Sequence, residues 1–342
     1  MGQGRPLGLV LRDLLPPAGP RDLLPVRTLV DWAALGERLG YDSVWVPEGR
    51  GRELTATIGA MGQATSRIRL ATGILPLYSR PPALVAMAAA TLADLTDGRF
   101  VLGVGTGHPA IIEEGYGLQF RQPLIAAREF ILIVRRALTG EKIGMHGRVF
   151  RVDAFQLEAR PDHRVPIYLA ALGPRMLRLA AQLADGVILN WNSPERVRLA
   201  VEMVRQEALL AGRDPASVQV VCFVRAAVTQ MHSIAWKVMR RLLAAYAAMP
   251  AYARMFEDAG FVGDVAAMSA AWAVGGVEAA AAAASDEFVR ELAVVGSAQE
   301  CVEGLQRYWE AGVDLVAAYP FPVGDATAAS MRATIEGLGL SR

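Results

Sequence analysis

Two side chains in the sequence are suited to moving a proton, and each follows a short apolar run. Glu48 comes after Ser43–Val46, and His108 comes after Phe100–Val104. A histidine titrates close to neutral pH, so it can donate a proton or form a hydrogen bond to a ring. Two other interpretations stay open from these residues alone. In the first, His108 only caps a loop, and in the second, Glu48 belongs to a solvated charge cluster with Arg50 and Arg52.

The stretch Val165–Trp191 has the pattern of a strand, a tight turn, a helix and a second strand. Its turn is Gly173-Pro174, and proline is well suited to the first position of a helix. Apolar residues then recur at helical spacing across Arg175–Leu183. Free N–H groups and the helix dipole at Gly173 to Arg175 favour an anion. We therefore expect a phosphate there, and the alternative is that Gly-Pro only punctuates the chain.

Glycines lie at the ends of two further predicted strands. The segment Gly103–Gly107 resembles part of a dinucleotide fingerprint, but that fingerprint needs a helix opening inside the motif. Pro109 follows instead, and the next predicted helix begins well downstream. The better explanation of these glycines is that the absence of side chains would let a flat ring approach the backbone closely. Gly73, near the end of Ile68–Ile74, suits a bulge or a similar close approach to a ligand.

Predicted strands and helices alternate along the whole chain. This rhythm is typical of an α/β protein, either a closed (β/α)8 barrel or an open doubly wound sheet, and eight strands favour the TIM barrel. We expect one TIM-barrel domain over residues 1–342, with a small hairpin insert at 140–160 and a helical insertion, free of strands, at 230–295 after strand seven. The predicted strands are Leu7–Leu11, Ser43–Val46, Ile68–Ile74, Phe100–Val104, Pro166–Ala170, Val187–Leu189, Val218–Val228 and Val313–Tyr319.

The loops that follow the strand C-termini form the functional face of a TIM barrel. Polar, glycine and proline residues of this chain cluster in those loops, so Glu48 and His108 should face one cavity. The predicted loops are Arg12–Leu24, Pro47–Arg52, Ile74–Pro82, Gly105–Gln122, Ala171–Gly173, Asn190–Pro194, the start of the 230s and Pro320–Gly324.

Composition argues against several classes of partner. The 342 residues carry a net charge of +1 with no basic run, which argues against nucleic acid. No uncharged apolar stretch of about 18 residues is present to span a membrane, and the N-terminus lacks the apolar core of a signal peptide. We therefore expect a cytoplasmic protein. Cys222 and Cys301 lie far apart, and no metal-ligand spacing occurs, so neither a disulfide nor a metal is expected.

Four segments together resemble the luciferase-like flavin and deazaflavin oxidoreductases, the family of bacterial luciferase and methylene-tetrahydromethanopterin reductase. They are YDSVWVPEGR, LATGILPLYSRPP, DGRFVLGVGTGHP and PIYLAALGPRMLRLAAQLADGVILNW. The resemblance covers residues 5–230 and the last strand and helix, and covers residues 230–295 poorly. It implies a (β/α)8 barrel with an insertion after the seventh strand, and FMN or coenzyme F420 at the strand C-termini.

The resemblance also implies roles for particular positions. In the deazaflavin branch a non-proline cis peptide after the third strand supports the ring, and it would fall at Gly73-Ile74. The Gly-x-Gly-x-Gly segment, Gly103 to Gly107, would lie beside the ring, with Gly105, Thr106 and Gly107 lining its edge. The cofactor phosphate would bind where the fifth strand meets its helix. The residues expected there are Leu172, Gly173, Pro174 and Arg175.

One departure from the family pattern bears on the substrate. The deazaflavin sugar dehydrogenases carry a histidine after the second strand and a glutamate after Gly-Thr-Gly. This chain has Gly49 and His108 at those places, with Glu48 beside the first. The difference argues against sugar-phosphate oxidation and for a reductase with other acid and base groups.

The expected function is hydride transfer between coenzyme F420 and a small organic substrate, with His108 or Glu48 handling a proton. The coenzyme would carry the redox chemistry while the barrel supplies position and shielding. Two alternatives stay open: an FMN-dependent luciferase-like monooxygenase that uses O₂, and a non-catalytic barrel that binds a phosphorylated ligand. The Ala- and Met-rich helices at 55–65 and 83–95 suit a homodimer, although such helices also pack tightly onto a barrel.

Overall fold

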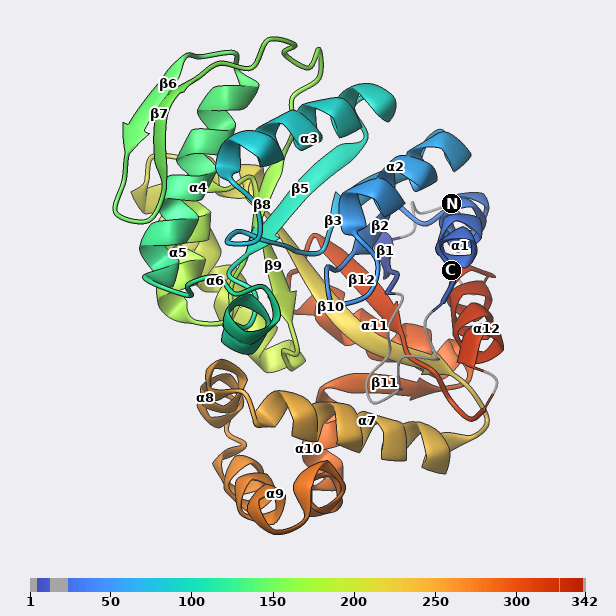
Figure 1. Ribbon diagram of the computed structural model, residues 1–342. Helices are drawn as coiled ribbons and strands as arrows, with labels where there is room; N and C mark the ends of the chain where they lie inside the picture. Colours follow the sequence, from blue (N-terminus) through green and yellow to red (C-terminus); the bar gives the residue numbers. More distant parts are fainter. Residues whose placement is uncertain (1–4, 13–23, 326, 341–342) are drawn as a thin grey trace.

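Eight parallel strands close into a barrel at the centre of the molecule (Figure 1). The computed structural model describes residues 5–12, 24–325 and 327–340. Each barrel strand pairs in parallel with the next one along the chain, and pairing of β1 with β12 closes the ring. The predicted (β/α)8 barrel is confirmed. The barrel strands are β1 (Leu7–Val10), β2 (Ser43–Val46), β3 (Arg69–Thr72), β5 (Phe100–Gly105), β8 (Ile167–Ala170), β9 (Gly186–Asn190), β10 (Gln219–Val228) and β12 (Leu315–Pro320).

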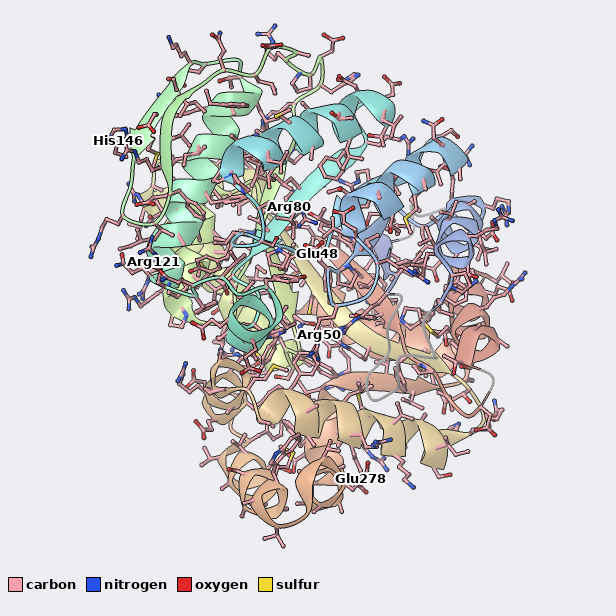
Figure 2. All side chains as sticks on the ribbon, in the orientation of Figure 1. Glu48, Arg50, Arg80, Arg121, His146 and Glu278 are labelled. Atoms are coloured by element: carbon pink, nitrogen blue, oxygen red, sulfur yellow. The ribbon has the colours of Figure 1, made fainter. Side chains whose placement is uncertain are left out.

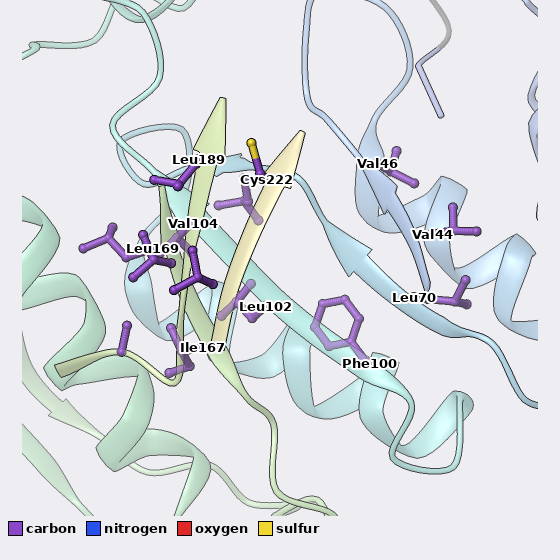
Figure 3. Packing of buried hydrophobic residues seen from close by; sticks show 14 of the residues in the cluster. Val44, Val46, Leu70, Phe100, Leu102, Val104, Ile167, Leu169, Leu189 and Cys222 are labelled. Carbon is purple, nitrogen blue, oxygen red and sulfur yellow. The ribbon is translucent and has the colours of Figure 1, made fainter. Parts of the chain in front are cut away.

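Helices follow the barrel strands and surround them (Figure 1). Their apolar faces pack on the outer face of the sheet, which forms the largest buried cluster of the described residues. Figure 3 shows members of this cluster on neighbouring strands, among them Phe100, Leu102 and Val104 of β5. The surrounding helices are α1 (Val26–Arg38), α2 (Leu54–Ala64), α3 (Pro82–Leu95), α4 (Pro123–Leu138), α5 (Pro174–Leu183), α6 (Pro194–Leu210), α11 (Ala298–Glu310) and α12 (Thr327–Leu340).

Alternate strand residues point into the barrel, as the period of a strand requires. On β10, Val221 and Phe223 belong to the interior cluster, whereas Cys222 and Val224 face the helices. The same alternation turns Arg225, two residues after Phe223, toward the barrel interior near its C-terminal end. Cys222 is a free, buried thiol, as is Cys301, in agreement with the expectation of no disulfide.

Two short strands were not expected from the sequence. β4 (Leu75–Pro76) pairs with the end of β5, where we predicted only loop. β11 (Ala293–Gly296) falls within the stretch predicted to lack strands, and it pairs with Arg225–Val228 of β10. The reason is the length of β10, which extends beyond its barrel neighbours and offers an edge. Four residues of β11 are too few to show a strand pattern in the sequence.

The predicted hairpin is present between α4 and β8. It consists of β6 (Ile143–His146) and β7 (Arg151–Phe155), which pair in antiparallel fashion. Glu129 of α4 is 7% exposed and accepts hydrogen bonds from the backbone N–H groups of Arg148, Val149 and Phe150 at 2.6–2.9 Å. One buried carboxylate therefore ties the hairpin turn to the barrel wall.

The insertion after β10 is helical, as predicted, and lies across one end of the barrel (Figure 1). Its helices are α7 (His232–Ala247), α8 (Pro250–Asp258), α9 (Val262–Ala283) and α10 (Asp286–Glu291). Among the described residues α9 alone is long and apolar enough to cross a membrane. Its backbone is non-helical at Gly275 and Gly276, and it carries two carboxylates. A single such helix is weak evidence for a membrane span.

Candidate functional site

The loops that follow the strand C-termini gather at the barrel mouth, next to the helical insertion. The first predicted loop, Arg12–Leu24, lies largely outside the described residues, since only its two end residues are described. The remaining predicted loops are described, and they carry most of the residues proposed for the site from the sequence. Gly73, Pro174 and Arg175 lie directly beside these loops.

Two predicted cofactor segments meet at one side chain, that of Ile74. The Gly73-Ile74 peptide bond is cis, at the position that the family resemblance implied. A Cβ placed on Gly105 would lie 3.0 Å from Cγ1 of Ile74 and 3.1 Å from Cβ of Ala170. Ile74 and Ala170, the last residue of β8, therefore both lie beside Gly105 at the end of β5. A planar group bound against Ile74 would have glycine backbone at its edge.

Gly103 serves packing and not a ligand. A Cβ on Gly103 would lie 2.1 Å from the carbonyl oxygen of Thr72, a distance that no side chain tolerates. The Thr72 hydroxyl donates to the Gly103 carbonyl at 2.6 Å, and the Gly103 N–H lies 2.7 Å from the same hydroxyl oxygen. The first glycine of the motif thus lets β3 and β5 approach, whereas Gly105 lies nearer the mouth.

The start of α5 fits an anionic group. Gly173 is the N-cap, no side chain caps the helix, and no atom lies within 4 Å of a Cβ built on Gly173. Uncapped N–H groups and the helix dipole attract a negative charge. Arg175 is exposed beside this turn. The described residues at this corner therefore suit the phosphate of a cofactor.

A second arginine at this corner was not predicted. Arg196 of α6 donates from Nη2 to the carbonyl of Leu172 at 3.1 Å, and its buried Nε has no hydrogen-bond partner in the described part of the chain. Burial lowers the pKa of Arg196 despite the opposing charge of Asp258. Little in the sequence indicated that Arg196 lies at this corner, because it is one of several arginines on an amphipathic helix.

Glu48 is held by an arginine that sequence reasoning missed. Both carboxylate oxygens of Glu48 accept from Arg80 at 2.6 Å, and Arg80 also contacts Glu53 at 2.6 Å. The side chain of Glu48 is only 6% exposed and that of Arg80 is 18% exposed. The bonds to Glu48 raise the pKa of Arg80 against the effect of burial. Figure 2 shows the two labelled side chains close together at the barrel mouth.

His108 faces the helical insertion. Its ring centroid lies 6.2 Å from that of Tyr246 on α7 and 5.8 Å from that of Tyr252 on α8. Burial lowers the pKa of His108, and the nearby charge of Arg12 lowers it further. No contact between His108 and Glu48 is found among the described residues. The two proton-transfer candidates therefore share the mouth but occupy separate environments.

A buried arginine and further aromatic rings adjoin Tyr246 and Tyr252. Arg225 is 4% exposed, and its guanidinium carbon lies 3.8 Å from the ring centroid of Trp191 and 4.3 Å from that of Tyr319. It donates a hydrogen bond to the side-chain oxygen of Asn190, whose amide nitrogen donates to the Tyr252 hydroxyl at 2.8 Å. The one sequence feature that could have indicated Arg225 was a single charged residue in an otherwise apolar predicted strand.

No group of three or more potential metal-ligating side chains occurs among the residues that the structure describes. His146 lies on the hairpin and pairs with Asp153 at 2.9 Å, and His163 pairs with Asp97 at 3.1 Å. Figure 2 places His146 at the edge of the molecule, far from the labelled mouth residues.

Comparisons with known proteins agree on one family. The family model described as luciferase-like monooxygenase matches residues 10–315. A 5,10-methylenetetrahydromethanopterin reductase of Methanolobus tindarius is 34% identical over 200 residues, or 58% of this chain and 61% of that protein. A reductase of the same name from Archaeoglobus fulgidus is 27% identical, with 84% of this chain and 87% of that protein covered.

An F420-dependent glucose-6-phosphate dehydrogenase of Intrasporangium calvum is 33% identical over 178 residues. That match spans 47% of this chain and 53% of the dehydrogenase, so the chain spans little more than half of the length of some curated relatives. Among solved structures, the coenzyme F420 dependent tetrahydromethanopterin reductase from Methanopyrus kandleri superposes with a TM-score of 0.81. It is 21% identical and covers 98% of both chains, which supports the barrel fold.

Proposed function

Because the chain belongs to the luciferase-like monooxygenase family, we propose that it transfers a hydride between coenzyme F420 and a small organic substrate. The observation that carries the proposal is the contact of Ile74 with the glycine backbone of Gly105, at a mouth that also carries the uncapped N-terminus of α5. A deazaflavin or flavin needs these three things: a support for its ring, room at its edge and an anchor for its phosphate.

Different residues would hold different parts of the cofactor. Ile74 supports the back of the ring, while Gly105, Thr106 and Gly107 line its edge. The turn at Leu172, Gly173, Pro174 and Arg175 holds the phosphate, with Arg196 as an added cation. F420, when bound, supplies a two-electron hydride donor or acceptor. Tyr246 and Tyr252 cover His108 and limit the access of water to it.

His108 is the better candidate for the proton. Its lowered pKa keeps the imidazole neutral at pH 7, so one ring nitrogen is available to accept a proton released by the substrate. Glu48 has both oxygens bonded to Arg80, and a proton there would have to displace a 2.6 Å charge-assisted bond. We assign Glu48 a positioning role for the loop that contains Gly49.

The alternative within the family is an FMN-dependent monooxygenase that uses O₂, because the same cradle would accept either ring. Titration of the purified protein with F420 and with FMN separates the two. We expect F420 to bind at least about tenfold more tightly than FMN, a difference of about 1.4 kcal/mol. Tight binding of FMN with substrate-dependent consumption of O₂ would overturn the assignment to F420.

A barrel that binds a phosphorylated ligand without turnover is the remaining candidate. If His108→Ala and Glu48→Ala changed neither ligand affinity nor any measured rate, this interpretation would be preferred. We further propose a cytoplasmic location and assembly as a homodimer. The exposed Leu84 and Met87 on α3, 49% and 48% exposed, support a partner surface there.

A further inference from the structure

Arg225 occupies an unusual place for a charge. It lies on the inward face of β10, two residues beyond Phe223, and its backbone partner on β12 is Tyr319. The Phe223 ring in turn packs 3.0 Å from the position that a Cβ of Gly73 would take. Two residues of strand advance by roughly 6.6 Å, so the backbone of Arg225 lies about that far along β10 from Phe223, toward the C-terminal end of the strand.

No acidic side chain in the described ranges pairs with Arg225. Its hydrogen bond goes to the neutral amide oxygen of Asn190, and rings of Trp191 and Tyr319 cover the guanidinium. A guanidinium that is 4% exposed has lost most of its water, and burial of a charge is unfavourable unless an opposite charge replaces that water. Cation–π contacts compensate for only part of this loss.

The pocket beside Arg225 contains further groups suited to an anion. Its cavity volume is about 20 Å³, room for one group of about the size of a water molecule, and its described lining has no carboxylate. Arg12 also lines it and forms a hydrogen bond with the Tyr319 side chain. Trp191 is 2% exposed, and its indole N–H is buried with no hydrogen-bond partner among the described residues. Two cations and an unused donor thus line one small aromatic pocket.

We propose that this pocket binds the carboxylate of a small organic acid, which is the substrate class of the enzyme. Arg225 is the specificity-determining residue, because the N–H groups of a guanidinium lie in its plane and match the two oxygens of a carboxylate. The indole N–H of Trp191 is a further donor to the same group.

The part of this inference that names the acid as the substrate rests on the proposed function. The part that assigns a carboxylate site to Arg225 does not. Carboxylate binding is measurable without any cofactor, and the probes are acetate and propionate, each small enough for the cavity and each compared with its neutral amide. Isothermal titration calorimetry is done on the whole protein, on Arg225→Gln and on Arg290→Gln. Arg290 is a matched control, because it also lies near an indole ring, 5.8 Å from that of Trp236, but on the exposed surface.

We expect the unaltered protein and Arg290→Gln to bind an acid and to bind its amide at least about tenfold more weakly. Arg225→Gln should weaken binding of the acid by a similar factor and leave F420 affinity unchanged. The proposal is overturned if acid and amide bind alike, if neither acid binds with a Kd below about 10 mM, or if Arg225→Gln binds the acid normally. Loss of F420 affinity in Arg225→Gln would assign Arg225 to the cofactor instead.

Thermal unfolding of Arg225→Met distinguishes a merely structural role. If the guanidinium is a ligand-binding charge that lacks a protein partner, its replacement by a methionine of similar length leaves Tm unchanged or raises it. A clear fall in Tm together with normal binding of the acids to Arg225→Gln would make Arg225 structural. If the acids bind as expected but F420 does not, the carboxylate site stands and the proposed function fails.

Discussion

The pairing of Glu48 with Arg80 allows a quantitative test of how the mouth is held. Replacing Glu48 by Gln removes the charge from a side chain that is 6% exposed and makes two 2.6 Å bonds. A hydrogen bond to a charged group contributes about 1.5–3 kcal/mol. Gln retains one acceptor and Arg80 retains Glu53, so we expect Glu48→Gln to lower the free energy of unfolding by about 2 kcal/mol.

Arg80→Met has a larger expected effect, because it leaves the Glu48 carboxylate nearly buried without its cation. Removing one partner of a buried pair destabilises by about 3–5 kcal/mol, and partial exposure of Arg80 argues for the lower end. In the double variant the first substitution has already removed the ion pair, so the second substitution lowers the free energy of unfolding by less than it does alone. We therefore expect an interaction energy of about 1–2 kcal/mol between the two sites, whereas independent sites add within about 0.5 kcal/mol.

Urea unfolding of the four proteins measures this double-mutant cycle, and the exposed pair Arg332–Glu336 is the control. That pair spans 2.8 Å with side chains 60% and 38% exposed, so its coupling should stay below about 0.5 kcal/mol. Additive losses at Glu48 and Arg80 would refute the reasoning. In turnover assays both single variants should lower kcat to a similar degree while leaving the pH profile intact, since Glu48 positions the loop.

Three further outcomes follow from individual side chains. Because burial keeps the pKa of His108 below 6.5, kcat/KM for substrate oxidation should fall as pH drops through that pKa, and His108→Gln should remove the limb from the pH–rate profile. Despite the opposing effect of burial, backbone N–H groups lower the pKa of Glu37 from 4.5 to about 2, which stabilises the fold above pH 4.5 and is lost as pH falls toward 2. Solvent screening reduces the contribution of Glu37 to the free energy of unfolding to about 1–2 kcal/mol. Urea unfolding at neutral and acidic pH should therefore show a free energy of unfolding that depends less on pH in Glu37→Gln than in the unaltered protein. Gly103→Ala should cost about 3 kcal/mol or more by a clash with the Thr72 carbonyl, whereas Gly173→Ala, with open space and a φ of −121°, should leave Tm unchanged; equal Tm values for the two variants would contradict this.

The barrel was predictable because its strands are short apolar runs separated by helices with clear stops. Ser43–Val46 is predicted to the residue, since it is buried on both faces and bounded by polar positions. β11 escaped prediction because its pairing depends on the extra length of β10, which is a property of the assembled sheet. The assignment of residues 1–342 to a single domain stays a prediction.

Much of the site depends on contacts between distant residues. Glu48 and Arg80 are 32 positions apart, and nothing local in the sequence links them. The role proposed for Arg225 could not be predicted for a related reason. A strand pattern shows on which face of the sheet a residue lies, but it does not show which charged side chains surround that residue. The cis peptide at Gly73-Ile74 came from family resemblance, because no local pattern of residue types predicts a non-proline cis bond.

The account depends most directly on where a cofactor binds, and a crystal structure of the protein grown with F420 would test it. The account predicts the deazaflavin ring against Ile74, with its phosphate at the α5 N-terminus beside Gly173 and within reach of Arg196. A mouth filled by side chains, or a phosphate bound elsewhere with no anion near Pro174, would contradict it.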